Sequence, residues 1–213
     1  APPTCNPSTR TPPIPAPPAR FVPMPTAVFV HPHPDDEAIF TGGSMRRAAD
    51  AGWRVVLVLA TGGEEGTMPD WVTVDAADHR RMETAEAASV LGAAEVHHLG
   101  FRDSGMAGWA TNRASGALAA SVDDATAVLA RLLERCGADA VVGQDPNGIY
   151  GHPDHVAVHR VVTGAAGAVG VDEVLEATID RRWLGELRTE RIRSGRLDPD
   201  AWCAAGLAGL GVA

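Results

Sequence analysis

The chain has 213 residues, which is enough for one domain with a sizeable buried core and too few for two comfortable ones. Its net charge is −9, from 18 basic and 27 acidic residues, and this argues against nonspecific nucleic-acid binding, which depends on a basic surface. No apolar run approaches the length of about 18 residues that a membrane-spanning helix needs. The apolar content of 45% is ordinary for a globular α/β protein.

The beginning of the chain is rich in proline. Residues 1–26 hold ten of the sixteen prolines. Proline fixes φ and lacks a backbone donor, so this stretch cannot form a helix or a central strand. We expect an extended arm, and a plain linker is a better interpretation than a Pro-rich ligand for another protein.

The three cysteines are Cys5, Cys136 and Cys203, and they are far apart in the sequence. The chain has no CxxC pair, so the sequence indicates neither a thiolate zinc site nor a redox dithiol. The sequence allows one disulfide, for instance through Cys5, but does not establish it.

A short buried strand is predicted over residues 27–30, and the stretch HPHPDDE follows it directly at residues 31–37. The turn after a parallel strand, at the carboxyl edge of the sheet, is where α/β proteins place their ligands. Imidazole with carboxylate is the ligand mixture that suits zinc and neighbouring divalent metals. The alternative is a polar turn that opens a helix with acidic residues.

Helices, strands and turns alternate through the middle of the chain. The expected segments are a helix from Asp35 to about Ala51, a strand over 53–60, the turn TGGEEG at 61–66, a loop over 68–77, a helix over 78–91, a strand over 95–99, a loop over 101–116 and a helix over 121–136. Ala85, Ala88 and Leu91 are expected on the inner face of their helix. The turn TGGEEG lacks the G-x-G-x-x-G spacing of a dinucleotide site. The long loop rich in Gly and Ser reads as an active-site loop.

A second histidine cluster, GHPDH at residues 151–155, follows another apolar run at 138–143 and opens a helix over 153–166. The two clusters share one context, in which a strand leads into a turn with His-Pro and Asp and then into a helix. In a parallel sheet both turns emerge at the same edge and can meet in space. Two matched clusters are hard to explain without a metal ion.

The order of the segments predicts an α/β fold with a Rossmann-like, mostly parallel sheet, helices on both faces and an active site at the carboxyl edge of the strands. A last strand is expected over 171–179. The chain then divides into the arm at 1–26, a core at 27–180 and a C-terminal extension of the same domain at 181–213.

Four motifs carry a resemblance to a known family. HPHPDDE, TGGEEG, RDSGMAG and DPNGIYGHPDH, in this order, resemble the zinc-dependent N-acetylglucosaminyl deacetylases of the PIG-L/LmbE family. Within it the chain is most similar to the mycothiol-pathway deacetylases and the mycothiol-conjugate amidases. The resemblance covers roughly residues 26–180, and the two histidine clusters in series are its specific part. It implies a zinc hydrolase that removes the N-acetyl group of an N-acetylglucosamine-containing glycoconjugate and releases acetate and a free amine.

The resemblance also implies a metal site. One zinc ion per chain would be held by His33, Asp36 and His155, and three protein ligands leave an open position for water, as in catalytic zinc sites. Asp35 would be the general base for that water. The alternative for Asp35 is a helix N-terminal acid favoured by the helix dipole.

Three residues of the second cluster also receive roles from the resemblance. His152 would stabilise the oxyanion or protonate the leaving amine, and Tyr150, the only tyrosine, would donate a hydrogen bond to the oxyanion. Asp154 would orient a metal-binding histidine by a hydrogen bond to the ring nitrogen that does not bind the metal.

The resemblance assigns substrate binding to Arg80 and Asp103, which would hold sugar hydroxyls. Arg81 is the neighbouring alternative to Arg80, and a solvated helix charge is the other interpretation of either arginine.

The other histidines receive no catalytic role. His31 is expected to be structural, and His159 has the spacing of a ligand on the helix of His155, although the resemblance does not use it. His79, His97 and His98 belong to no recognisable constellation.

The resemblance implies a small-molecule glycoconjugate as the partner, with no nucleic acid and no membrane span, and leaves the aglycone and the oligomeric state open. The alternatives are a metal-dependent amidase for a non-acetyl or non-sugar amide, such as a thiol-conjugate amidase, and a sugar-binding protein without catalysis. A cytoplasmic location is favoured by the resemblance, and an exported mature form is the alternative.

Overall fold

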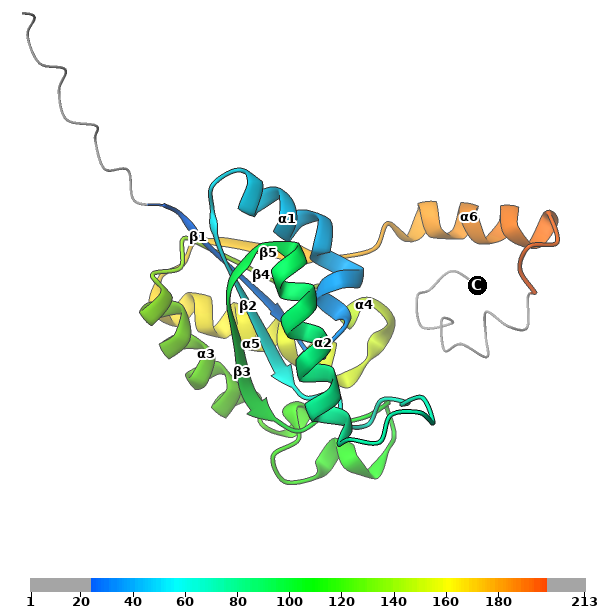
Figure 1. The fold of residues 1–213 in the computed structure, drawn as a ribbon, viewed down its shortest axis with the longest axis horizontal. Helices are drawn as coiled ribbons and strands as arrows, with labels where there is room; N and C mark the ends of the chain where they lie inside the picture. The colour runs from blue at the N-terminus through cyan, green and yellow to red at the C-terminus, as the bar shows by residue number, and fades with distance from the viewer. Residues whose placement is uncertain (1–23, 199–213) are drawn as a thin grey trace, which may run out of the picture.

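The computed structural model describes residues 24–198, so the expected Pro-rich arm lies almost wholly outside the described residues. Five parallel strands form one sheet in the order β3-β2-β1-β4-β5 (Figure 1). The strands are β1 (Thr26–His31), β2 (Arg54–Thr61), β3 (Ala93–Phe101), β4 (Ala140–Gln144) and β5 (Glu173–Ala177). The expected parallel α/β sheet is confirmed.

Helices pack on both faces of the sheet and bury two apolar layers. On one face Leu129 and Val158 pack against Val56, and on the other face Met45 packs with Leu57. Successive residues of β2 therefore enter opposite layers, which is why this strand is apolar throughout. The helices of the first layer are α3 (Val122–Cys136) and α5 (Pro153–Val169), and those of the second are α1 (Gly42–Asp50) and α2 (Ala76–Leu91).

The strand order reverses between β1 and β4. From β1 the chain builds outward through β2 to β3, and it then crosses to the other side of β1 to form β4 and β5. Ligands of open α/β sheets bind beside such a switch point, outside the carboxyl ends of the strands. The two histidine clusters follow the two strands that flank this point.

The helix expected to begin at Asp35 differs from the prediction. Asp35 has φ of 100° and stands outside the helix, and a π-helical turn at Glu37–Thr41 comes before α1. α1 begins at Gly42, where a Cβ would lie 3.3 Å from Leu91 Cδ2 of α2. The absence of a side chain at Gly42 therefore lets Leu91 pack closely against the start of α1.

Of the three residues expected on the inner face of α2, Ala88 and Leu91 pack against the core and Ala85 does not. Thr84 and Ala88 are buried, whereas Ala85 is exposed. The ends of the helix follow from its sequence, since the Asp75 side chain accepts from the first backbone N–H groups and Gly92 ends the helix with φ of 79°.

Two regions at the carboxyl edge are irregular. The expected active-site loop contains short 3₁₀ turns at Ala110–Arg113 and Leu118–Ala120. The segment after β4 forms the short helix α4 (Gly148–Gly151).

The helix α6 (Arg181–Arg193) extends away from the sheet (Figure 1) and buries none of its residues. The rest of the expected C-terminal extension, residues 199–213, lies outside the described residues. Between residues 24 and 198, no helix combines the length and the apolar character needed to cross a membrane.

Candidate active site

Three side chains from two distant turns meet beside the switch point. His33 Nδ1 lies 3.2 Å from Asp36 Oδ2, and His155 Nε2 lies 3.4 Å from the same oxygen. All three residues are buried. His33 and Asp36 come from the turn after β1, and His155 comes from the first turn of α5. The structure thus brings together the three residues predicted as metal ligands, and their role as ligands stays a prediction.

The buried imidazole of His155 fits a metal ion. It has no exposed surface, and neither of its ring nitrogens has a hydrogen-bond partner among the described residues. A buried polar group without a partner is costly, whereas a metal ion would use the nitrogen lone pair that faces Asp36. Ligand atoms of His33, His152 and His155 lie within 4.8 Å of one another, so the same cluster offers three imidazoles and a carboxylate. This donor set suits a divalent transition metal.

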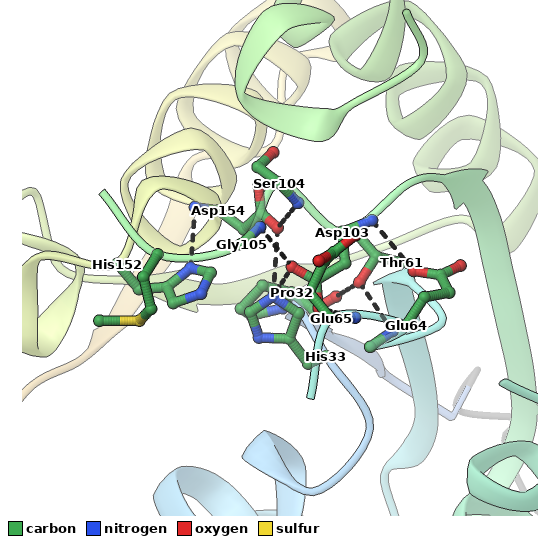
Figure 2. Close-up of polar contacts among 12 residues, drawn as sticks. Pro32, His33, Thr61, Glu64, Glu65, Asp103, Ser104, Gly105, His152 and Asp154 are labelled. Atoms are coloured by element: carbon green, nitrogen blue, oxygen red, sulfur yellow. Dashed lines mark hydrogen bonds and ion pairs between the residues drawn. The ribbon is translucent and has the colours of Figure 1, made fainter. Parts of the chain in front are cut away.

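His33 is held by carboxylates on its other side (Figure 2). Its Nε2 lies 3.1 Å from Asp154 Oδ2 and 3.5 Å from Asp103 Oδ1, and the Ser104 N–H donates to Asp154. Burial alone would lower the pKa of His33, but Asp103, Asp154 and Asp36 outweigh it and hold the pKa well above its ordinary value. A metal ion would displace the proton from Nδ1, beside Asp36, while the Nε2–H continues to donate to Asp154, as is usual for metal-binding histidines. Asp154 therefore has the geometry of the predicted orienting residue.

His152 has one nitrogen available to the site. Its Nδ1 accepts the backbone N–H of Asp154 at 3.2 Å, as the N-cap of α5 (Figure 2). The ring proton therefore sits on Nε2, where it can be donated. Burial and the nearby His33 lower the pKa of His152, which favours this neutral form. Its ring lies edge-on to that of His33, with centroids 4.6 Å apart.

Tyr150 stands beside the same cluster. Its ring centroid is 5.0 Å from that of His155. Burial, together with the negative charge of Asp36, raises the pKa of Tyr150 to about 12. The phenol therefore keeps its proton and can act as a hydrogen-bond donor.

The backbone before Tyr150 is strained. Ile149 is buried with φ of 60° and ψ of −67°, an unusual conformation for a β-branched residue. Asp145 holds it, because its Oδ1 accepts from the N–H groups of Asn147 and Ile149 at 3.0 and 2.8 Å. The Thr178 hydroxyl donates to the other carboxylate oxygen at 2.7 Å. Asp145 thereby positions the segment that carries Tyr150.

Asp35 and Arg80 face each other at the mouth of the site. Arg80 Nη1 lies 3.6 Å from Asp35 Oδ2 and donates to the Pro34 carbonyl at 3.3 Å. The side chain of Asp35 is 59% exposed, so substrate and water can reach it. Partial burial and the charge of Asp36 raise the pKa of Asp35, although Arg80 opposes this shift. A raised pKa makes the carboxylate a better proton acceptor.

The glycines of the turn TGGEEG leave the space that the Arg80 guanidinium occupies. A Cβ on Gly63 would lie 2.6 Å from Arg80 Nη1, and Gly63 has φ of 70°. Glycine is favoured at this position, because it adopts a positive φ without strain and has no Cβ that would collide with the guanidinium. The turn also touches Asp103, whose backbone N–H donates to Glu64 Oε2 at 3.0 Å and whose Oδ2 accepts from the Glu65 N–H at 3.3 Å (Figure 2).

A pocket of about 300 Å³ opens onto this arrangement. Its wall includes every predicted site residue except Asp154 and His155, which lie buried behind it. Trp109 and Met106 from the long loop complete the wall and leave large apolar surfaces exposed. The pocket is therefore lined mainly by charged and polar groups, with two large apolar side chains among them.

The family model for PIG-L, described as GlcNAc-PI de-N-acetylase, matches residues 28–166. The chain belongs to the PIG-L family. A curated relative from Streptomyces scabiei, named 1D-myo-inositol 2-acetamido-2-deoxy-alpha-D-glucopyranoside deacetylase, is 39% identical over 169 residues. The match covers 73% of this chain and 52% of the relative, so the chain spans about half the length of the curated relatives it matches.

Solved structures agree with the PIG-L fold. A conserved protein from Thermus thermophilus is 26% identical with a TM-score of 0.52, covering 73% of this chain and 64% of the other. The N,N'-diacetylchitobiose deacetylase from Pyrococcus horikoshii is 23% identical with a TM-score of 0.55, covering 83% and 72%. The family expected from the four motifs is confirmed.

Two further histidines, His31 and His159, lie near this PIG-L site but have hydrogen-bond or ion-pair partners outside it. His31 is buried between Thr41 Oγ1, at 2.7 Å, and Gln144 Nε2, at 3.1 Å, and burial lowers its pKa to about 4. It is therefore a neutral residue that joins β1 to β4. His159 Nδ1 lies 3.0 Å from Glu176 Oε1, outside the metal cluster.

Arg80, and not its neighbour Arg81, lines the pocket. Arg81 is largely exposed, and its Nη1 lies 3.8 Å from Asp78 Oδ1 on the same helix. The sequence reasoning missed Ser104, Glu64 and the loop-holding Asp145. The position of Asp145 directly after β4 was the available signal, because it is the first polar residue to leave that strand at the carboxyl edge.

Proposed function

We propose that this chain hydrolyses the N-acetyl group of an N-acetylglucosamine-containing glycoconjugate, using one zinc ion held by His33, Asp36 and His155. The observation that carries the proposal is the fully buried His155, whose unpaired Nε2 faces Asp36 behind a pocket of polar residues. The same proposal takes residues 27–180 as the catalytic core, since the last strand of the sheet ends at Ala177, and 181–213 as its extension.

A zinc ion in this site would polarise the amide carbonyl and make a water molecule acidic at neutral pH. Asp35 accepts the proton of the attacking water, and its exposed carboxylate at the pocket mouth supports this role. Arg80 keeps the carboxylate oriented from 3.6 Å away. The water oxygen then bonds to the carbonyl carbon of the acetamide.

The charge that develops on the carbonyl oxygen needs hydrogen-bond donors. His152 supplies Nε2–H, since its Nδ1 is already occupied by a backbone N–H, and Tyr150 supplies its phenol proton. When the C–N bond breaks, the proton taken up by Asp35 passes to the departing nitrogen, directly or through His152. Acetate and a free amine result.

The class of substrate is supported by the relatives. The Streptomyces scabiei relative is named for a 2-acetamido glucopyranoside of inositol, and the Pyrococcus horikoshii enzyme is named for diacetylchitobiose. Both names describe an acetamido sugar, which favours the same group here. The aglycone is open among an inositol, a thiol conjugate and a glycosylated natural product.

A metal-dependent amidase for other amides is the second candidate, and Asp103 favours it. The carboxylate of Asp103 is buried, accepts the Gly105 N–H at 2.8 Å and lies against His33, so it has less capacity left for sugar hydroxyls than a free loop acid. A site that serves only the metal would not discriminate between sugars and simpler amides.

Release of acetate and amine separates the two candidates. The substrates are N-acetylglucosaminyl inositol, N,N'-diacetylchitobiose and simple acetamides, each assayed with zinc-loaded and with chelator-stripped protein. We expect zinc-dependent turnover of at least one acetamido sugar well above that of simple acetamides. Equal turnover of sugars and acetamides would favour the amidase, and no acetate release from any of these substrates would contradict the proposal.

A further inference from the structure

A second group of metal-binding side chains lies away from the candidate active site. Glu95 and His97 are two residues apart on β3, so both side chains leave the same face of the strand, toward α3. Cys136 is the last residue of α3. Ligand atoms of these three residues lie within 4.8 Å of one another. His97, which was expected to belong to no site, therefore lies in a cluster of possible metal ligands.

This cluster lies too far from the candidate active site to take part in it. Glu95 pairs in register with Val56, near the amino end of β2, whereas the candidate active site follows the carboxyl ends of β1 and β4. Cys136 ends its helix before Gly137, which has φ of 59° and turns the chain back toward β4. The cluster thus joins the edge strand β3 to the end of α3.

The spacing is close to that of a tetrahedral metal site. Zinc binds imidazole nitrogen at about 2.0 Å and thiolate sulfur at about 2.3 Å, so ligand atoms in a tetrahedron stand roughly 3.3–3.6 Å apart. His97 Nε2 lies 3.0 Å from Glu95 Oε2. Glu95 and His97 are half-buried and Cys136 is buried, so small side-chain rotations can complete the geometry while the site stays open to solvent.

Arg54 holds the carboxylate in place. Its Nη2 pairs with Glu95 Oε1, and its Nη1 donates to the Cys136 carbonyl at 3.0 Å. The second oxygen, Oε2, is left facing His97. Metal-binding carboxylates are commonly supported in this way by a hydrogen-bond donor on the oxygen that does not bind the metal. Without a metal, the same residues would form only a surface ion-pair network beside a buried thiol.

We propose that Glu95, His97 and Cys136 bind a second divalent ion of the borderline-soft class, such as zinc or cobalt, with a water molecule in the fourth position. A thiolate and an imidazole exclude magnesium and calcium as the preferred ions. The proposal does not depend on the proposed deacetylase function. Metal binding must release the proton of the Cys136 thiol, because the thiolate is the form that binds the ion.

Cobalt titration of the reduced full-length chain tests the proposal, because a thiolate ligand gives a charge-transfer band in the near ultraviolet. The predicted ligands of the candidate active site include no sulfur, so the band reports on the second site alone. We expect the band in the parent chain and in the matched controls Cys5→Ser and Cys203→Ser, and its loss in Cys136→Ser. No band in the parent, or an undiminished band in Cys136→Ser, would overturn the proposal.

A second variant keeps the proposal testable if circular dichroism shows that the Cys136→Ser chain does not fold. His97→Ala changes a half-buried residue, keeps the thiol and should weaken cobalt binding by more than about tenfold, a loss seen even for outer partners of a metal site. The matched control is His98→Ala, whose side chain leaves the opposite face of β3. Equal cobalt affinity in His97→Ala and the parent, read from the same band, would show that His97 is not a ligand and would overturn the proposed site.

Discussion

Asp35 combines a strained backbone with an exposed carboxylate. A φ of 100° is unusual for any residue other than glycine, and such strain is retained where the surroundings enforce it. Here the enforcing contacts are the Asp35 N–H, which donates to Glu37 Oε2 at 3.0 Å, and Arg80 on the carboxylate. The conformation turns Asp35 away from the helix that its neighbours enter and toward the pocket.

Replacing Asp35 by asparagine tests its role as the base. The Asp35→Asn chain should keep its metal and its fold but lose activity by about 10²–10⁴-fold, because the amide cannot accept a proton from water. The measurements are acetate release and metal content on one sample. Asp70→Asn, a change at an exposed acid of the neighbouring loop, is the control and should remain fully active. A loss of less than about tenfold in Asp35→Asn would remove Asp35 from this role.

Asp103 is the residue on which sugar selectivity can be tested. The Asp103→Asn variant keeps the size of the side chain and an oxygen for the Gly105 N–H. If Asp103 holds sugar hydroxyls, its turnover of an acetamido sugar should fall much more than its turnover of a minimal acetamide. The two rates are compared in the same zinc-loaded sample. Equal losses on both substrates would mean that Asp103 serves His33 and the metal site instead.

At the scale of elements, the turn after β2 is as important as the two histidine clusters. It brings no predicted catalytic side chain, yet its glycines lie against the guanidinium of Arg80 and its backbone supports Asp103. The turn after β4 does carry predicted catalytic side chains, and there Asp145 fixes the strained Ile149 that precedes Tyr150. These turns shape the site through their backbones.

Gly63→Ala should damage the site beyond its effect on stability. The new Cβ would cost about 1–2 kcal/mol for the positive φ and would also displace Arg80 from Asp35. Gly52→Ala is the matched control, since Gly52 has φ of 84° with nothing within 4 Å of the added Cβ. We expect similar losses in the free energy of unfolding, measured with urea, but a loss of activity in Gly63→Ala alone. Equal activity in both variants would contradict this account of the turn.

At the scale of the whole molecule, the site ties together distant parts of the chain. His33 and Asp154 are 121 positions apart, and they meet because β1 and β4 are neighbours at the point where the strand order reverses. A metal ion bound by His33, Asp36 and His155 would join the turn after β1 to the start of α5. Metal binding should therefore stabilise the native state of the whole domain.

The sequence predicted the strands, the carboxyl edge as the place of the site and the two histidine turns, because apolar runs and His-Pro-Asp spacing are local signals. It placed Ala88 and Leu91 correctly on the inner face of α2 but was wrong for Ala85, because Thr84 is buried there instead. It could not find the cluster of Glu95, His97 and Cys136, because these residues approach one another only once β3 packs beside α3. Backbone strain at Ile149 is equally invisible in a sequence, since a β-branched residue argues against it.

The most direct test of the central claim is the metal content and acetate release of the parent chain, of His155→Ala and of His159→Ala. The control is close, because His159 lies one turn further along α5 but pairs with Glu176. The account predicts that His155→Ala binds about one zinc ion per chain fewer than the parent and is inactive, whereas His159→Ala matches the parent in both. Full metal content in His155→Ala would contradict the account and place the metal ion elsewhere.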